Sequence, residues 1–393
     1  MRTGAIFEED VKPPITAIAT YLRPLSIAIP QPVPKTNNFD LIRLAAALQV
    51  AVTHATYLFG ITGRQWPLHV ITDLFPGVPV FFFISGFLIS HSFERNPELR
   101  DYVQNRILRI YPALVVCLVL SIGSVWASGY LIRVSAPFSQ WAKWIVAQLS
   151  VAQYNPGFMR GYGMGILNAS TWTISIELQF YILVPLTYAA LRLQRLRHAQ
   201  GNLALLALTG FFLLANVACV HFMDRSTALF AYLDLSCVPW FYMFLTGLLA
   251  QRNFGLVGRA LAGRFVPLFL GYCALGLLAA RVFGWRFDND LNPVLFLALA
   301  AVTFAAAFSA PTLSDTLLRR QDLSYGVYLY HAPAINFLLA TGVLAGARGA
   351  LAAMGATFAL ALGSWWLIER PALRLKHRAV YSHDHITSLR RTA

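Results

Sequence analysis

The sequence breaks into apolar runs of about twenty residues separated by short polar segments, and this pattern limits the chain to few architectures. A helix of roughly 20 apolar residues crosses a hydrocarbon core of roughly 30 Å. Charged residues make up 12% of the 393 residues, whereas soluble domains carry roughly 25%. We therefore predict an all-α, polytopic integral membrane protein with about ten transmembrane helices. The expected spans are residues 39–59, 71–93, 108–128, 172–192, 203–222, 228–250, 265–283, 291–312, 323–345 and 348–369.

The basic residues decide the expected topology, because short loops rich in Lys and Arg stay in the cytoplasm. With ten crossings, all of the basic clusters fall on one side of the membrane. These clusters lie in the N-terminal tail, at 94–109, 192–198, 251–264 and 319–320, and after residue 369. The shorter apolar stretch 137–153 contains Lys143, and an eleventh crossing there would reverse every later cluster. We predict that both termini are cytoplasmic and that 129–171 is a long external loop.

The same topology signals account for the formal net charge of +14, so the charge does not indicate a nucleic-acid partner. The expected organisation has three parts: a flexible cytoplasmic tail over 1–36, a transmembrane domain over 37–376 and a cytoplasmic tail over 377–393. The sequence contains no Walker, Rossmann, zinc or GxSxG motif. We therefore expect no metal site.

Ionisable residues inside lipid are costly unless they are paired, so each one within a span is a candidate for function. Arg43 and His54 lie eleven residues apart in the first span, which puts them on one helix face and about 16 Å apart along the axis. Structural roles are the alternative for both. Arg43 could be an anchor paired with Asp40, and His54 could make an interhelical hydrogen bond.

Three further charged residues have spacings or positions that favour a binding or catalytic role. Arg106 and Arg109 share a helix face at the entry to the third span, where two guanidiniums suit a phosphate group, although they could also be topology anchors. Glu177 is the only carboxylate well inside the fourth span. Asp234 in the sixth span is a weaker candidate of the same kind.

Polar residues in two other spans could have either a functional role or a role in helix packing. The Ser85-Gly86 step in the second span could line a substrate site or only permit close helix packing. The ninth span carries Tyr325, Tyr328 and His331 close together. Such residues often bridge helices, so packing is the alternative to a functional role.

Several of these residues belong to six sequence blocks that follow one another between Asn38 and Lys376. The blocks are Asp40-Leu-Ile-Arg43 with His54, Gly77 to Ile89, Arg106-Ile-Leu-Arg109-Ile-Tyr-Pro112, Trp172 to Tyr181, Leu323 to His331, and Glu369-Arg-Pro371. In this order they resemble the motifs of acyltransferase family 3, membrane proteins that O-acylate sugars of lipopolysaccharides, exopolysaccharides, Nod factors and some antibiotics. Three positions, Pro79, Thr173 and Leu178, depart from the family pattern, and the roles of the residues that they replace are not carried over.

The resemblance implies an acyl-CoA donor, usually acetyl-CoA, that arrives from the cytoplasm as a substrate and is not a permanently bound cofactor. Arg43, Arg106 and Arg109 would hold its phosphates. His54 would act as general base on the acceptor hydroxyl or carry the acyl group transiently, and Glu177 would orient its ring. His54 and Glu177 are thus the expected catalytic residues. The expected substrate-lining residues are Ser85, Trp172, Tyr328 and His331.

The acceptor implied by the resemblance is a hydroxyl of a carbohydrate or lipid-linked glycan, such as an exopolysaccharide, an O-antigen or a Nod factor. The implied location is the bacterial inner membrane. Transfer of a succinyl or longer acyl group, for example to a macrolide, is the alternative among enzymes. A transporter is the alternative from another class, but the sequence shows neither the inverted repeats nor the paired broken helices typical of transporters.

Overall fold

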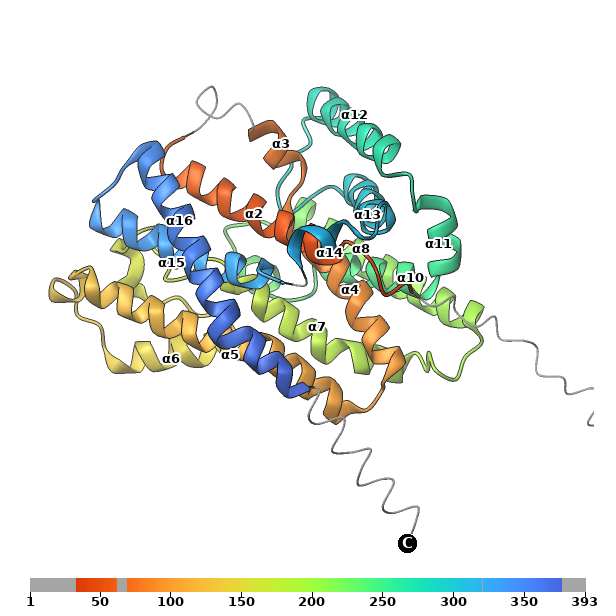
Figure 1. Cartoon of the computed structure of the whole chain (residues 1–393), viewed down its shortest axis with the longest axis horizontal. Helices are drawn as coiled ribbons and strands as arrows, with labels where there is room; N and C mark the ends of the chain where they lie inside the picture. The colour runs from red at the N-terminus through yellow and green to blue at the C-terminus, as the bar shows by residue number, and fades with distance from the viewer. Residues whose placement is uncertain (1–32, 62–68, 320, 377–393) are drawn as a thin grey trace, which may run out of the picture.

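The computed structural model describes residues 33–61, 69–319 and 321–376, and every regular element within these ranges is helical (Figure 1). This confirms the all-α prediction for the described chain, whereas the expected tails lie outside it apart from 33–36 and stay predictions. The first eight helices are α2 (Phe39–Leu58), α3 (His69–Leu74), α4 (Gly77–Arg95), α5 (Leu99–Ala127), α6 (Phe138–Gln148), α7 (Thr171–Ala190), α8 (His198–Phe222) and α9 (Ala228–Asp234). The others are α10 (Phe241–Arg252), α11 (Phe254–Leu261), α12 (Phe265–Phe283), α13 (Pro293–Phe308), α14 (Leu313–Leu318), α15 (Ser324–Thr341) and α16 (Gly346–Ser364), which continues into a π-helical turn at Trp365–Glu369.

Seven helical segments of the described chain are long and apolar enough to cross a membrane. They are α2, Thr72–Arg95, α5, α7, α8, α12 and Gly346–Lys376. The protein is therefore an integral membrane protein, while the count of ten crossings stays a prediction. The three other expected spans are shorter, less apolar or interrupted. α13 has 16 residues, α15 carries polar side chains such as His331 and Asn336 among its 18 residues, and the expected span 228–250 is divided into α9 and α10.

The break between α9 and α10 corrects the expectation of a continuous helix over 228–250. Pro239 has no N–H to donate and disfavours a helical conformation in the preceding residue. Side chains satisfy backbone groups that the break frees. The Gln179 side chain accepts a hydrogen bond from the Cys237 N–H at 2.7 Å, and Asn216 donates to the Pro239 carbonyl at 3.0 Å. Because unpaired backbone groups are costly inside a membrane, these contacts stabilise the non-helical segment.

The segment between α5 and α7 contains α6, whose 11 residues extend only about 16 Å. This length is short of the roughly 30 Å of a hydrocarbon core. The loop that follows α6 is attached to α15 by Asn336. The Asn336 side chain accepts from the Met164 N–H at 2.9 Å and donates to the carbonyls of Ile166 and Leu167 at 2.6 and 2.9 Å. The loop is thus fixed about one and a half turns from His331 on the same helix.

Two glycines bring α4 and α10 together in the centre of the bundle. A Cβ atom added at Gly86 would overlap the carbonyl of Phe244, and one added at Gly247 would overlap the carbonyl of Phe83. Such reciprocal small residues let helix backbones approach closely, which is a common way to pack helices in membranes. α2 packs against α4 on one side and against α15 and α16 on the other (Figure 1).

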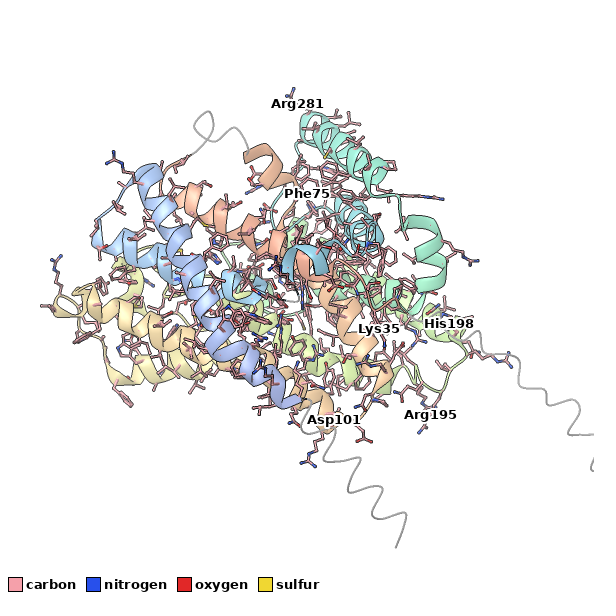
Figure 2. All side chains as sticks on the ribbon, viewed as in Figure 1. Lys35, Phe75, Asp101, Arg195, His198 and Arg281 are labelled. Atoms are coloured by element: carbon pink, nitrogen blue, oxygen red, sulfur yellow. The ribbon has the colours of Figure 1, made fainter. Side chains whose placement is uncertain are left out.

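Polar contacts join several helix ends at one end of the bundle. Glu94, at the end of α4, accepts hydrogen bonds from Arg252 at 2.5 Å and from the Tyr188 hydroxyl at 3.0 Å, which joins the ends of α10 and α7. Figure 2 shows Arg195 and His198 along the same edge of the molecule as Asp101. The basic clusters at 94–109, 192–198 and 251–264 therefore gather at one end. That this end faces the cytoplasm is a prediction from the positive-inside rule.

Candidate active site

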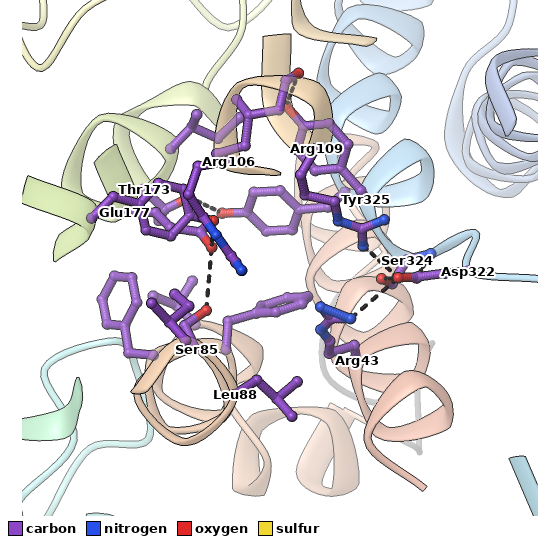
Figure 3. Close-up of a pocket in the computed structure, with 18 of the residues that line it drawn as sticks. Arg43, Ser85, Leu88, Arg106, Arg109, Thr173, Glu177, Asp322, Ser324 and Tyr325 are labelled. Atoms are coloured by element: carbon purple, nitrogen blue, oxygen red, sulfur yellow. Dashed lines mark hydrogen bonds and ion pairs between the residues drawn. The ribbon is translucent and has the colours of Figure 1, made fainter. Parts of the chain in front are cut away.

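A cavity of about 330 Å³ lies between α2, α4, α5, α7 and α15 (Figure 3). Its volume falls at the lower end of the range of small-molecule sites, roughly 300–1,000 Å³. The polar residues that line it are Arg43, Ser85, Arg106, Arg109, Thr173, Glu177, Tyr181, Asp322, Ser324, Tyr325, Tyr328 and Lys376. Four of these side chains are basic and two are carboxylates, so the lining carries a net positive charge. A concave surface of one charge sign attracts ligands of the opposite sign.

Asp322, in the connection between α14 and α15, joins two of the arginines. Its carboxylate forms ion pairs with Arg109 and with Arg43, whose Nη1 lies 3.2 Å away, and it accepts a hydrogen bond from the Ser324 hydroxyl at 2.5 Å. Burial alone would raise the pKa of this carboxyl, but Arg109 and Arg43 hold that pKa well below its usual range. Asp322 therefore fixes a guanidinium from α2 beside one from α5.

Arg106 lies one turn before Arg109 on α5 and has a different environment. Among the described residues it forms no ion pair, and its buried Nε has no hydrogen-bond partner. Its guanidinium lies over the rings of Tyr102 and Tyr181, 5.7 and 5.4 Å from their centroids. Pro185 in α7 has no N–H, so the Tyr181 carbonyl accepts a hydrogen bond from the Tyr102 hydroxyl at 3.0 Å, which fixes these rings. Arg106 thus points into the cavity with its charge available (Figure 3).

Glu177 belongs to this cavity and not to the histidine site. Its Oε1 accepts hydrogen bonds from the Tyr181 hydroxyl at 2.6 Å and from the Ser85 hydroxyl at 3.2 Å (Figure 3). The hydrogen bonds found within the described chain do not connect Glu177 with His54. The expectation that Glu177 orients the His54 ring is therefore corrected.

The neighbour of His54 is His331, from α15. His54 Nδ1 lies 3.0 Å from His331 Nε2, and the two ring centroids are 5.1 Å apart. His331 is fully buried, whereas His54 is half-buried. The Tyr328 ring, which lines the cavity, lies 5.9 Å from the His331 ring, and its hydroxyl shares a hydrogen bond of 2.6 Å with Thr173. Tyr328 therefore lies between the cavity and the histidine pair.

A proline in α15 helps to fix the position of this pair. Pro333 cannot donate to the carbonyl four residues earlier, at Leu329. That carbonyl instead accepts a hydrogen bond of 3.1 Å from the side chain of Asn168, which precedes α7. His331 lies between Leu329 and Pro333 on α15, so the contact holds its backbone against the start of α7.

The residues expected from the sequence therefore divide into two groups. Arg43, Arg106, Arg109 and Glu177 line the cavity, and so do Ser85 and Tyr328. His54 and His331 form a separate pair beside it. Trp172 lies outside the lining and packs on Trp240, with ring centroids 5.5 Å apart. In the Ser85-Gly86 step the packing role is confirmed, because Gly86 packs against α10. Ser85 lines the cavity, and its role towards a substrate stays a prediction.

Six polar residues of the cavity were not among the expected site residues: Thr173, Tyr181, Asp322, Ser324, Tyr325 and Lys376. Asp322 directly precedes the Leu323–His331 block, and an acidic residue at a helix entry is a partner that buried arginines require. Its position could therefore have suggested the ion pair. Nothing in the sequence distinguishes Lys376 from the other basic residues of its cluster. Within the described ranges, no three His, Cys, Asp or Glu side chains are grouped so that they could hold a metal ion.

The chain is similar in sequence to known proteins over most of its length. Residues 36–370 match the model of a family described as an acyltransferase domain. A nodulation protein of Rhizobium leguminosarum bv. viciae, Nodulation protein 10, is 31% identical over 86% of this chain and 94% of its own length. An O-acetyl transferase of Shigella phage Sf6 is 23% identical over 86% of this chain and 96% of its own length.

A longer relative matches over part of its length. O-acetyltransferase OatA of Staphylococcus aureus is 25% identical over 77% of this chain, but the match spans only 51% of OatA. No solved structure matches this chain.

Proposed function

Because the chain belongs to this acyltransferase family, we propose that it is a membrane O-acyltransferase that moves an acyl group, in the first place acetyl, from acyl-CoA to a carbohydrate hydroxyl. Two of its relatives are named O-acetyl transferases, which supports the acetyl group and the oxygen acceptor. The nodulation relative and the resemblance to sugar-acylating proteins support a glycan as the acceptor. We further propose that the protein resides in the bacterial inner membrane.

The positively charged cavity is the observation that carries this proposal. It combines guanidiniums from α2 and α5 with Lys376, and guanidiniums bind phosphate groups through charge-assisted hydrogen bonds. CoA presents several phosphates at one end of a long, flexible arm that carries the thioester at the other. The phosphates would bind at Arg106, Arg109 and Lys376, and the arm would extend along α2 towards His54.

The distance along α2 fits this placement. Arg43 lines the cavity and His54 lies eleven residues further on the same helix face, which is roughly 16 Å. Tyr328 lies between the two positions, so its side chain would have to accommodate the thioester end. Glu177 would accept a hydrogen bond from an amide N–H of the arm, since Tyr181 and Ser85 already fix its other contacts.

The proposed transfer uses His54 as general base. The imidazole removes the proton from the acceptor hydroxyl while the hydroxyl oxygen attacks the thioester carbonyl carbon. The new C–O bond forms, the C–S bond breaks, and the CoA thiolate leaves. The proton on His54 then passes to this thiolate, which returns the base to its starting state.

The test uses the purified protein in lipid nanodiscs with acetyl-CoA and a panel of oligosaccharides. We expect release of free CoA that depends on an oligosaccharide and is accompanied by an acetylated sugar, detected by mass spectrometry. His54→Gln should lower this transfer because it removes the proposed base. His221→Gln is its matched control, because His221 is exposed at the end of α8. Absence of sugar acetylation with all donors and acceptors would contradict the proposed function. Transfer of succinyl but not acetyl would correct the acyl group alone.

A further inference from the structure

The histidine pair is part of a chain of three polar groups within the bundle. His331 Nδ1 lies 2.7 Å from the backbone carbonyl oxygen of Tyr328, one turn earlier in α15. His331 Nε2 lies 3.0 Å from His54 Nδ1. The His331 ring also contacts the backbone carbonyl of Val327, so its described partners are backbone carbonyls and His54. The positions of the hydrogens can be assigned from this network.

The first contact fixes the proton on His331. A carbonyl oxygen accepts hydrogen bonds and cannot donate them. Nδ1 of His331 must therefore carry the proton that the Tyr328 carbonyl accepts. In a neutral imidazole only one nitrogen is protonated, so His331 Nε2 then has a free lone pair.

His331 is neutral because its surroundings do not compensate a charge. The side chain is fully buried, and its hydrogen-bond partners in the described chain, the backbone carbonyls of Tyr328 and Val327 and the ring of His54, are not anionic. An uncompensated charge at such a position would be very costly. The lone pair on His331 Nε2 accordingly accepts a hydrogen bond, and the donor must be His54 Nδ1–H.

On this basis, and resting on the proposed function, we infer that His331 is a positioning residue that selects the tautomer of His54. With its proton on Nδ1, neutral His54 has its free lone pair on Nε2. This nitrogen belongs to the side of the ring that does not contact His331, so it is the atom that can take the acceptor proton. The neutral imidazole of His331 thus corresponds to the Asp carboxylate of a Ser-His-Asp triad, which accepts a hydrogen bond from the catalytic histidine.

The pair also acts during the transfer. When His54 Nε2 takes the proton of the acceptor hydroxyl, His54 becomes an imidazolium whose Nδ1–H still donates to His331 Nε2. That hydrogen bond becomes charge-assisted and stronger. When Nε2 returns the proton to the CoA thiolate, the neutral tautomer is restored. No proton is exchanged between the two rings, so His331 ends each cycle as it began.

The test that needs no substrate is ¹⁵N NMR of the histidine rings. The full-length protein is labelled with ¹⁵N-histidine, placed in nanodiscs at alkaline pH, and its His54 signals are assigned with His54→Gln. We expect a protonated Nδ1 and an unprotonated Nε2 on His54. In His331→Leu, the preference for this tautomer is lost. A proton on Nε2 of His54 in the unaltered protein would overturn the inference.

Kinetics provide the second test, with a conservative variant as the control. His331→Leu should lower kcat by roughly 10²-fold, the scale of positioned general-base catalysis, and leave KM for acetyl-CoA unchanged, because His331 lies outside the cavity lining. His331→Gln should recover kcat to within about 10-fold, since its side-chain oxygen can accept from His54 Nδ1–H. A folded His331→Leu variant with unaltered kcat, or a His331→Gln variant as slow as His331→Leu, would contradict the inference. If the unaltered protein transfers no acyl group, the proposed function fails, while the NMR result still decides the tautomer.

Discussion

Arg106 and Arg109 have equivalent positions in the sequence, and the structure predicts that their removal has different consequences. Arg106 contributes a free charge to the cavity, whereas Arg109 compensates the buried carboxylate of Asp322. We therefore expect Arg106→Ala to weaken CoA binding with little effect on stability. We expect Arg109→Ala to weaken binding and also to destabilise the fold.

The expected magnitudes follow from these contacts. A hydrogen bond to a charged group contributes about 1.5–3 kcal/mol, so Arg106→Ala should raise the Kd for CoA by roughly 10- to 150-fold. Removing one partner of a buried ion pair typically costs about 3–5 kcal/mol. Arg43 still contacts Asp322 at 3.2 Å after Arg109→Ala, so the loss of stability should lie at the lower end of that range. Asp322→Asn combined with Arg109→Ala should recover most of it.

Isothermal titration of CoA into nanodisc-embedded protein gives the Kd, and thermal unfolding gives the stability. Arg100→Ala is the matched control, because Arg100 is exposed on the same helix and does not line the cavity. Arg106→Lys should recover only part of the affinity, since an ammonium lacks the planar fork of a guanidinium and its stacking on Tyr102 and Tyr181. An unchanged Kd for CoA in Arg106→Ala would show that Arg106 does not bind CoA and would favour the alternative that it is a topology anchor. Equal stability of the Arg109→Ala and Arg106→Ala variants would refute the distinction between the two arginines.

Three further predictions concern the base, the helix packing and the topology. His54→Gln should lower sugar acetylation at least about 10²-fold with an unchanged Kd for CoA, as measured by the assays above; near-normal turnover would remove His54 from the mechanism. Gly86→Ala should destabilise the protein by about 1–3 kcal/mol in thermal unfolding, because a Cβ there overlaps the backbone of α10. Gly210→Ala should leave the stability unchanged, because a Cβ there meets open space. Equal stability of the two variants would argue against the close α4–α10 contact. In a background without the native cysteines, Ser135→Cys should react with an impermeant thiol reagent added outside and Arg195→Cys only after permeabilisation; labelling of both from one side would contradict the topology.

Several structural features depend on contacts that no sequence pattern predicts. Gly86 packs against Phe244 and Gly247 against Phe83 because α4 and α10 cross at these positions, although each glycine alone could equally mark a flexible point or an open surface. The break before α10 is similar. Pro239 is visible in the sequence, but the 228–250 run is apolar enough to suggest a single helix. The side chains of Gln179 and Asn216 that stabilise the break come from two other helices.

The sequence alone determined the all-helical membrane architecture, the positions of most spans, and the Arg43–His54 and Arg106–Arg109 pairs. These properties are local: hydropathy over twenty residues and spacing within one helix follow directly from the order of the residues. The Arg43–Asp40 contact at 3.1 Å is local and was expected, whereas only the tertiary structure decided the distant partners of these residues. His54 meets His331 across 277 positions and Arg109 meets Asp322 across 213, because helices far apart in the chain pack side by side. The order of the residues does not determine which helix faces which, or at what height. Glu177 was therefore expected to orient His54, whereas the packing of α15 against α2 puts His331 there.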